Sequence, residues 1–146
     1  MGALDYARLL KRNPSRSKSR VTEPAVVGAV IDLGLCLNLL DSQYIRLTRE
    51  AYRNLKSLHA SARRPLPRNK SVGRSRDLLL RRLDCAVLEM VHLIRDEQGL
   101  TPFDSTRGVF VEGAPAYPEA GIHELSHIQI CIRDESRIKG YFRVRR

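Results

Sequence analysis

Two histidines and a glutamate near the end of the chain have the types and spacing of a zinc-peptidase motif. His123, Glu124 and His127 match the pattern H-E-x-x-H. On a helix, two histidines four residues apart share one face and hold Zn²⁺, and the glutamate activates the metal-bound water. The motif can therefore do this chemistry only if its segment is helical.

The residues around the motif favour a strand. Pro118 and Gly121 stand just upstream, where a motif helix would have to continue. Downstream, isoleucines at positions 128, 130 and 132 alternate with other residue types, which is the period-two pattern of a strand. Catalytic zinc also needs a third protein ligand, and the other two histidines, His59 and His92, lie far upstream. We therefore expect no bound metal and keep a zinc peptidase only as a third hypothesis.

The same alternation indicates a different polar site. If the three isoleucines face the core, His127, Gln129 and Cys131 face the opposite way, toward a cleft. Glu112 ends an earlier predicted strand, on the face that carries Phe110. A carboxylate, an imidazole and an amide in one place make a plausible site, although each is also an ordinary residue for an exposed strand.

The loop between these two strands, "GAPAYPEAGIHEL", has no regular period and is expected to lie over or beside that site. Within it, Tyr117 stands between two prolines. Its ring is a candidate either for anchoring the loop or for stacking on a ligand.

The positive charge of the chain is concentrated in three stretches. The net charge is +10, and residues 11–20, 63–76 and 137–146 carry no acidic side chain. Such clustering is typical of a protein that binds a polyanion, nucleic acid first, although basic loops are often only solvated. We therefore expect basic loops at 12–24 and 63–76. The candidate nucleic-acid contacts are the basic residues of the second loop, Arg63, Arg64, Arg68, Lys70, Arg74 and Arg76.

Length and cysteine content bound the class of protein. A chain of 146 residues corresponds to a single domain. Its three cysteines, Cys36, Cys85 and Cys131, are an odd number at wide spacing, which favours reduced thiols in the cytoplasm. No apolar run has the length of a membrane span, and the first residues do not resemble a signal peptide.

The order of periodic segments predicts an α+β fold with a mostly antiparallel sheet packed by helices. Helices are expected over 4–11, 43–60 and 77–98, the second capped by Asp41 or Ser42. The core side of the second and third helices is predicted to carry Tyr44, Leu47, Ala51, Leu55, Leu58, Leu79, Leu83, Ala86, Val87, Met90 and Ile94. Strands are expected over 25–33, where the apolar run indicates burial on both faces, and over 108–112, 127–132 and 138–142.

Three stretches, "EPAVVGAVIDLGLCLNLLDS", "RGVFVEGAPAYPEAG" and "SHIQICIRDESRIKGYF", resemble the C-terminal part of a bacterial family with an ADP-ribosyltransferase-like fold. Its members include toxins of phage-defence toxin–antitoxin systems. The resemblance implies that Gln129 contacts the nicotinamide ribose of NAD and helps position the acceptor. Glu112 is the second candidate for this catalytic position, because it opens the loop that recognises the acceptor in that family. It also implies an antitoxin partner.

In that family, a His-Gly strand and a Gly-x-Tyr-Phe strand come earlier and cradle NAD. This chain contains neither, and the helix predicted at 4–11 begins without a capping residue. We therefore expect that the chain is truncated or that its start codon is misplaced. The chain as given should be inactive by itself, and only a full-length form should use NAD. The alternative hypothesis is a non-catalytic domain that binds nucleic acid or is related to toxins.

Overall fold

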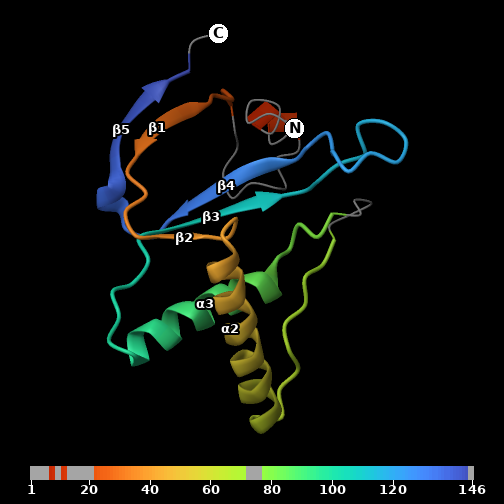
Figure 1. Cartoon of the computed structure of the whole chain (residues 1–146). Helices are drawn as coiled ribbons and strands as arrows, with labels where there is room; N and C mark the ends of the chain where they lie inside the picture. The colour runs from red at the N-terminus through yellow and green to blue at the C-terminus, as the bar shows by residue number, and fades with distance from the viewer. Residues whose placement is uncertain (1–6, 9–10, 13–21, 72–76, 145–146) are drawn as a thin grey trace. The chain divides into compact units, whose positions relative to one another are not determined.

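A computed structural model describes residues 7–8, 11–12, 22–71 and 77–144 (Figure 1). The chain divides into two compact units. We call Met1–Asp32 with Glu135–Arg146 the terminal unit and Leu33–Asp134 the central unit. The helix expected over 4–11 lies mostly outside the described residues. The single-domain interpretation stays a prediction.

The terminal unit contains a two-stranded antiparallel ribbon. β1 (Val27–Ile31) pairs with β5 (Ile138–Arg143), which follows the short 3-10 helix η2 (Glu135–Arg137). The prediction that the first strand is buried on both faces was wrong, because Val27 and Val30 are 63% and 57% exposed. A ribbon with a single neighbouring strand covers less apolar surface than the interior of a larger sheet.

The central unit contains a three-stranded sheet in the order β2-β3-β4. β3 (Ser105–Phe110) pairs antiparallel with β4 (His127–Ile132) and parallel with β2 (Cys36–Asn38). β2 was not predicted, since three residues are too short to show a period. With β1–β5 also antiparallel, the molecule is α+β with mostly antiparallel pairing, as the sequence predicted.

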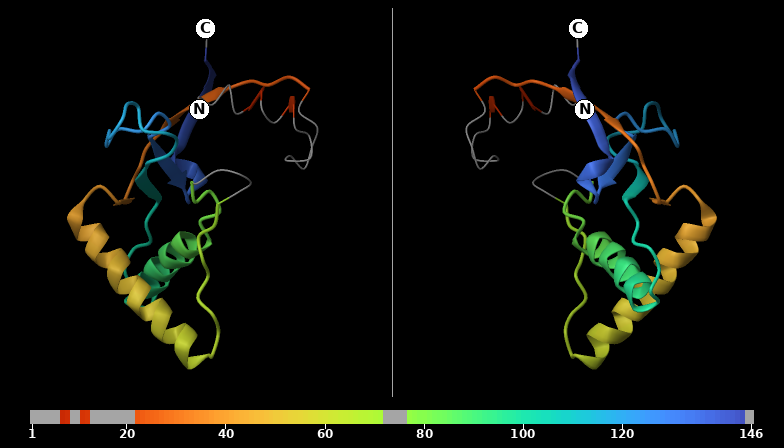
Figure 2. Two further views of the ribbon diagram at one scale, coloured as in Figure 1. Left: turned by 90° about the vertical axis from the view of Figure 1, so that its right-hand side faces the viewer. Right: turned by 90° about the vertical axis from the view of Figure 1, so that its left-hand side faces the viewer.

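Two helices cross within the central unit (Figures 1 and 2). α2 (Ser42–Ser61) begins as predicted, with the Asp41 carboxylate accepting from the N–H of Gln43 at 2.9 Å. α3 (Arg82–Glu97) begins later than the predicted residue 77. The Asn69 side-chain oxygen fixes this start by accepting from the N–H of Leu83 at 2.9 Å, so a residue from the preceding loop satisfies the helix terminus.

The core of the central unit lies between the helices and the sheet. Its buried members are Leu37, Ala51, Leu55, Met90, Val91 and Phe103. The expected helix stripes supply three of these six, but two of the predicted positions are wrong. Leu58 is 55% exposed near the end of α2, and Leu79 is 47% exposed and precedes α3.

Two of the three isoleucines of β4 are exposed. Ile128 and Ile130 are 50% and 43% exposed, and Val109, the β3 partner of Ile128, is 51% exposed. The prediction that the isoleucines face the core was therefore wrong at these two positions, whereas Ile132 is half-buried. Alternation separated the two faces of the strand, but the polar face is not covered either, since His127, Gln129 and Cys131 are also exposed.

No helix in the described ranges is both long enough and apolar enough to cross a membrane.

His92 on α3 gives the central unit a predicted dependence on pH. The Arg133 guanidinium donates to His92 Nδ1 at 2.9 Å, and the ring lies edge-on to Phe103. Burial lowers the pKa of His92 below its usual value, and the positive charges of Arg133 and Arg95 lower it further. In the window between the lowered pKa and the ordinary value of 6.5, the unfolded chain binds the proton more readily than the folded protein.

We therefore expect His92 to make the free energy of unfolding decrease as the pH falls below about 6.5. His92→Gln keeps an acceptor for Arg133 and removes the titrating ring, so its stability should fall less steeply. Thermal unfolding followed at a series of pH values measures both dependences. An equally steep fall in the variant would contradict this role for His92.

Candidate binding groove

The H-E-x-x-H segment does not form a helix. His123 lies in an isolated antiparallel bridge with Pro115, and His127 is the first residue of β4. The two imidazoles also have separate partners, since His123 Nδ1 contacts the Gly113 carbonyl oxygen at 3.0 Å. The prediction of a strand over 127–132 is confirmed, and the helical geometry that a zinc-peptidase motif needs is missing from this segment.

The register of β3 and β4 brings the polar candidates onto one face of the sheet. Gln129 pairs with Gly108, and His127 pairs with Phe110. The rings of His127 and Phe110 are stacked, with centroids 6.0 Å apart and an angle of 22° between their planes. His127, Gln129 and Phe110 therefore lie together on the sheet face opposite Ile128 and Ile130.

His127 and Gln129 orient each other. The imidazole Nδ1 lies 2.6 Å from the Leu125 carbonyl oxygen, which can only accept, so Nδ1 carries the proton. In the neutral ring Nε2 is then an acceptor, and it takes a hydrogen bond from the Gln129 amide nitrogen at 2.6 Å. This arrangement fixes the Gln129 amide and leaves its oxygen as the available acceptor.

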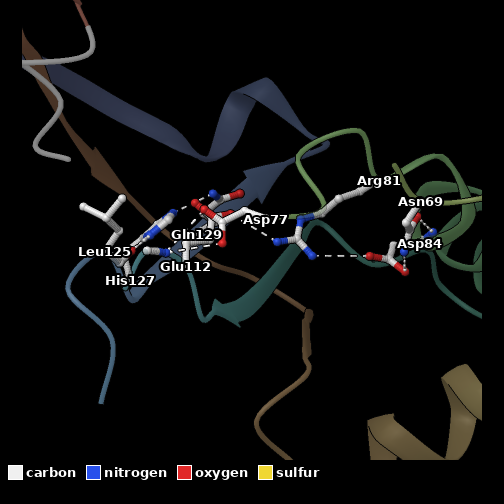
Figure 3. A network of polar contacts seen from close by, with 9 residues as sticks. Asn69, Asp77, Arg81, Asp84, Glu112, Leu125, His127 and Gln129 are labelled. Carbon is white, nitrogen blue, oxygen red and sulfur yellow. Dashed lines mark hydrogen bonds and ion pairs between the residues drawn. The ribbon is translucent and has the colours of Figure 1, made fainter. Parts of the chain in front are cut away.

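Arg81 connects this polar pair to the start of α3 (Figure 3). Its guanidinium lies over the Phe110 ring, 4.3 Å from the centroid. It donates to Glu112 Oε1 at 3.1 Å and lies 3.6 Å from Asp84 Oδ2. Asp84 in turn accepts from the Asn69 amide at 2.7 Å. One arginine thus holds together the end of β3, the beginning of α3 and the ring beside His127.

An open groove of about 1110 Å³ lies between the two helices and this sheet face. Its walls come from α2, α3, the segment after β2, β3 and Gln129 of β4. The lining is largely apolar, and its charged side chains are those of Arg49, Arg53, Arg81 and Asp84. The groove thus combines an apolar lining with positive charge, and Gln129 is the candidate catalytic residue that lines it.

The other predicted site residues lie outside the lining. The Glu112 side chain is only 14% exposed and forms an ion pair with Arg81. His127 contacts two lining residues, Gln129 by a hydrogen bond and Phe110 by ring stacking. Tyr117 is 59% exposed near the end of a hairpin arm, where Ala116 N–H donates to the Ile122 carbonyl. The loop that was expected to be irregular therefore continues the β3–β4 pairing.

The basic loop after α2 is described only in part. Its residues Arg63, Arg64, Arg68 and Lys70 are exposed, in agreement with either solvated or phosphate-binding side chains. Arg74 and Arg76 lie outside the described residues. No three histidine, cysteine or carboxylate side chains in the described ranges gather as metal ligands.

Sequence reasoning missed the groove arginines of α2 and the linking role of Arg81. Arg49 and Arg53 are spaced at i and i+4, which a search for contiguous basic windows overlooks and a helical projection finds. Arg81 acts through residues that are distant in the sequence. Its partners Phe110 and Glu112 come from a segment 29 or more residues later, so no local signal indicates them.

The chain matches none of the family models, curated proteins or solved structures with which it was compared. Fold and groove therefore define its class: an α+β protein with a cationic, largely apolar groove between two helices and a sheet.

Proposed function

We propose that the chain is part of an ADP-ribosyltransferase-like domain that transfers ADP-ribose from NAD to a macromolecule, with nucleic acid as the candidate acceptor, in a toxin of the phage-defence type. The observation that carries the proposal is the position of Gln129. This residue matches the family position that contacts the nicotinamide ribose, and its amide lines the groove while His127 holds it in place. A cytoplasmic location and an antitoxin partner belong to the same proposal.

The described residues fit only one side of an NAD molecule. Gln129 suits a ribose hydroxyl, and the guanidinium groups of Arg49 and Arg53 suit phosphate. Phe110 offers no free platform for a nicotinamide ring, since Arg81 covers one face and His127 is stacked with it. The 146 residues also lack the His-Gly and Gly-x-Tyr-Phe motifs. No reaction step through NAD is therefore derived for this chain.

The test uses labelled NAD with bulk RNA, DNA and protein as acceptors. The 146-residue chain is expected to transfer no label. A form extended upstream by in-frame codons for the two missing motifs should transfer it. In that form, Gln129→Ala should lower transfer by about 10²-fold or more, because a positioned polar group at the reacting centre is lost. Gln98→Ala, at the exposed end of α3, is the matched control.

Circular dichroism of Gln129→Ala shows whether its fold is intact. If the extended form carrying Gln129→Ala transfers label at the wild-type rate, Gln129 has no role in the transfer of ADP-ribose. Transfer by the 146-residue chain alone would refute the inference that the two earlier strands are needed.

A non-catalytic domain that binds nucleic acid is the second candidate. The clustered positive charge of the sequence favours it, together with the absence of the two NAD motifs from the 146 residues. This candidate predicts binding by the extended form without any transfer of label.

A further inference from the structure

A row of positive charge follows one face of α2. Arg46, Arg49, Arg53 and Lys56 stand at spacings of three, four and three residues, which brings them onto the same side of the helix. All four are exposed, and the only acidic residue within the helix is Glu50. With a rise of 1.5 Å per residue, the row extends for about 15 Å. We call these four residues the α2 stripe.

No ion pair in the described ranges neutralises the stripe, and its nearest carboxylate in the helix is Glu50, one turn from Arg46 and Arg53. Within the described ranges, ion pairs join Arg81 to Asp84 and Glu112, and Arg137 to Asp32. None of the ion pairs found there involves the α2 stripe. Aligned cations without acidic partners raise the local positive potential and attract polyanions.

The stripe borders the groove. Arg49 and Arg53 belong to its lining, and Tyr52, which is 38% exposed, lies between them in sequence and also lines it. The interior beside them is aliphatic, with Leu83 and Val87 of α3 among its residues. Cations at the edge and an apolar interior with one available aromatic ring match a ligand whose charged backbone carries flat rings.

We propose that the groove binds a single strand of nucleic acid, with consecutive phosphates along the α2 stripe and one unpaired base inserted against Tyr52. A base in a duplex is stacked and presents only its edge, whereas an unpaired base can enter a cavity and stack on an aromatic side chain. The Gln129 amide at the opposite wall meets a polar edge of the base. This binding does not rest on ADP-ribose transfer and is measured without NAD.

The experiment is fluorescence anisotropy with labelled DNA and RNA oligonucleotides of about 12 nucleotides, each single-stranded and as a matched duplex. Arg49→Ala/Arg53→Ala should weaken single-strand binding about tenfold or more. It should also reduce the log–log salt slope by about 1.4, because two phosphate contacts are lost. The control Arg82→Ala/Arg107→Ala removes the same charge from residues outside the groove lining and should change binding far less.

Two further variants separate charge from base recognition. Arg49→Lys/Arg53→Lys retains the charge and should retain most of the affinity. Tyr52→Leu should weaken single-strand binding about fivefold or more while leaving the salt slope unchanged, since stacking releases no counterions. A preference for DNA or for RNA supports the site equally and identifies the sugar that it accepts.

Three outcomes would overturn the proposal. The first is that Arg49→Ala/Arg53→Ala and its control Arg82→Ala/Arg107→Ala bind the single strand with equal affinity, while circular dichroism shows that both are folded. The second is a duplex that binds as tightly as the single strand while Tyr52→Leu has no effect. The third is competition by polyglutamate as effective as that by the oligonucleotide at equal charge, which would assign the stripe to an acidic peptide.

Discussion

Replacing Phe103 by alanine is expected to reduce the free energy of unfolding of the central unit by about 3–5 kcal/mol. Phe103 is 2% exposed and lies edge-on to Tyr44 at a centroid distance of 5.6 Å. His92 contacts the ring, and the Arg95 guanidinium lies 4.2 Å from its centroid. Truncation therefore removes aromatic contacts to both helices and opens a cavity.

Small domains have only about 5–15 kcal/mol of stability, so Phe103→Ala should be largely unfolded at moderate denaturant. Urea unfolding measures the change in midpoint and slope. Phe103→Leu keeps most of the volume and should cost about 1.5 kcal/mol or less. Phe142→Ala serves as a control because Phe142 is 52% exposed in the terminal unit. A loss below about 1 kcal/mol for Phe103→Ala would show that this ring does not anchor the core.

The second large effect is expected at Arg81. Arg81→Met keeps an apolar stem of similar length but removes the cation from Glu112, whose side chain is only 14% exposed. A covered carboxylate that loses its partner costs more than the net value of the pair. Because Arg81 itself is 27% exposed, solvent screens part of the effect, and we expect a loss of about 2–3 kcal/mol.

A double-mutant cycle isolates this interaction. Glu112→Gln removes the charge that Arg81→Met leaves without a partner, so the double variant should recover about 1 kcal/mol or more relative to the additive sum. Arg82→Met at the neighbouring exposed position should change stability by no more than about 0.5 kcal/mol. Equal losses from Arg81→Met and Arg82→Met would mean that the contacts of Arg81 with Glu112 and Phe110 do not stabilise the fold.

Local patterns in the sequence determined the main elements. The cap at Asp41, the period of α2 and the alternation in β4 are properties of neighbouring residues, and they predicted those elements closely. Alternation also rejected a helix for the H-E-x-x-H segment and placed Gln129 opposite the isoleucines. Each of these results depends on the preferences of a few consecutive residues, which a sequence displays directly.

Tertiary structure decided how far each face is buried. Periodicity separates the two sides of β4 but does not say how much packing either side receives. In the structure Ile128, Gln129 and Ile130 are all exposed, and Gln129 is in the lining of the groove. The start of α3 depends on Asn69, and the link between α3 and β3 depends on Arg81 and Glu112. These contacts join residues far apart in the chain, so they form only when folding brings the segments together. The groove exists for the same reason: packing, and not any single segment, creates its walls.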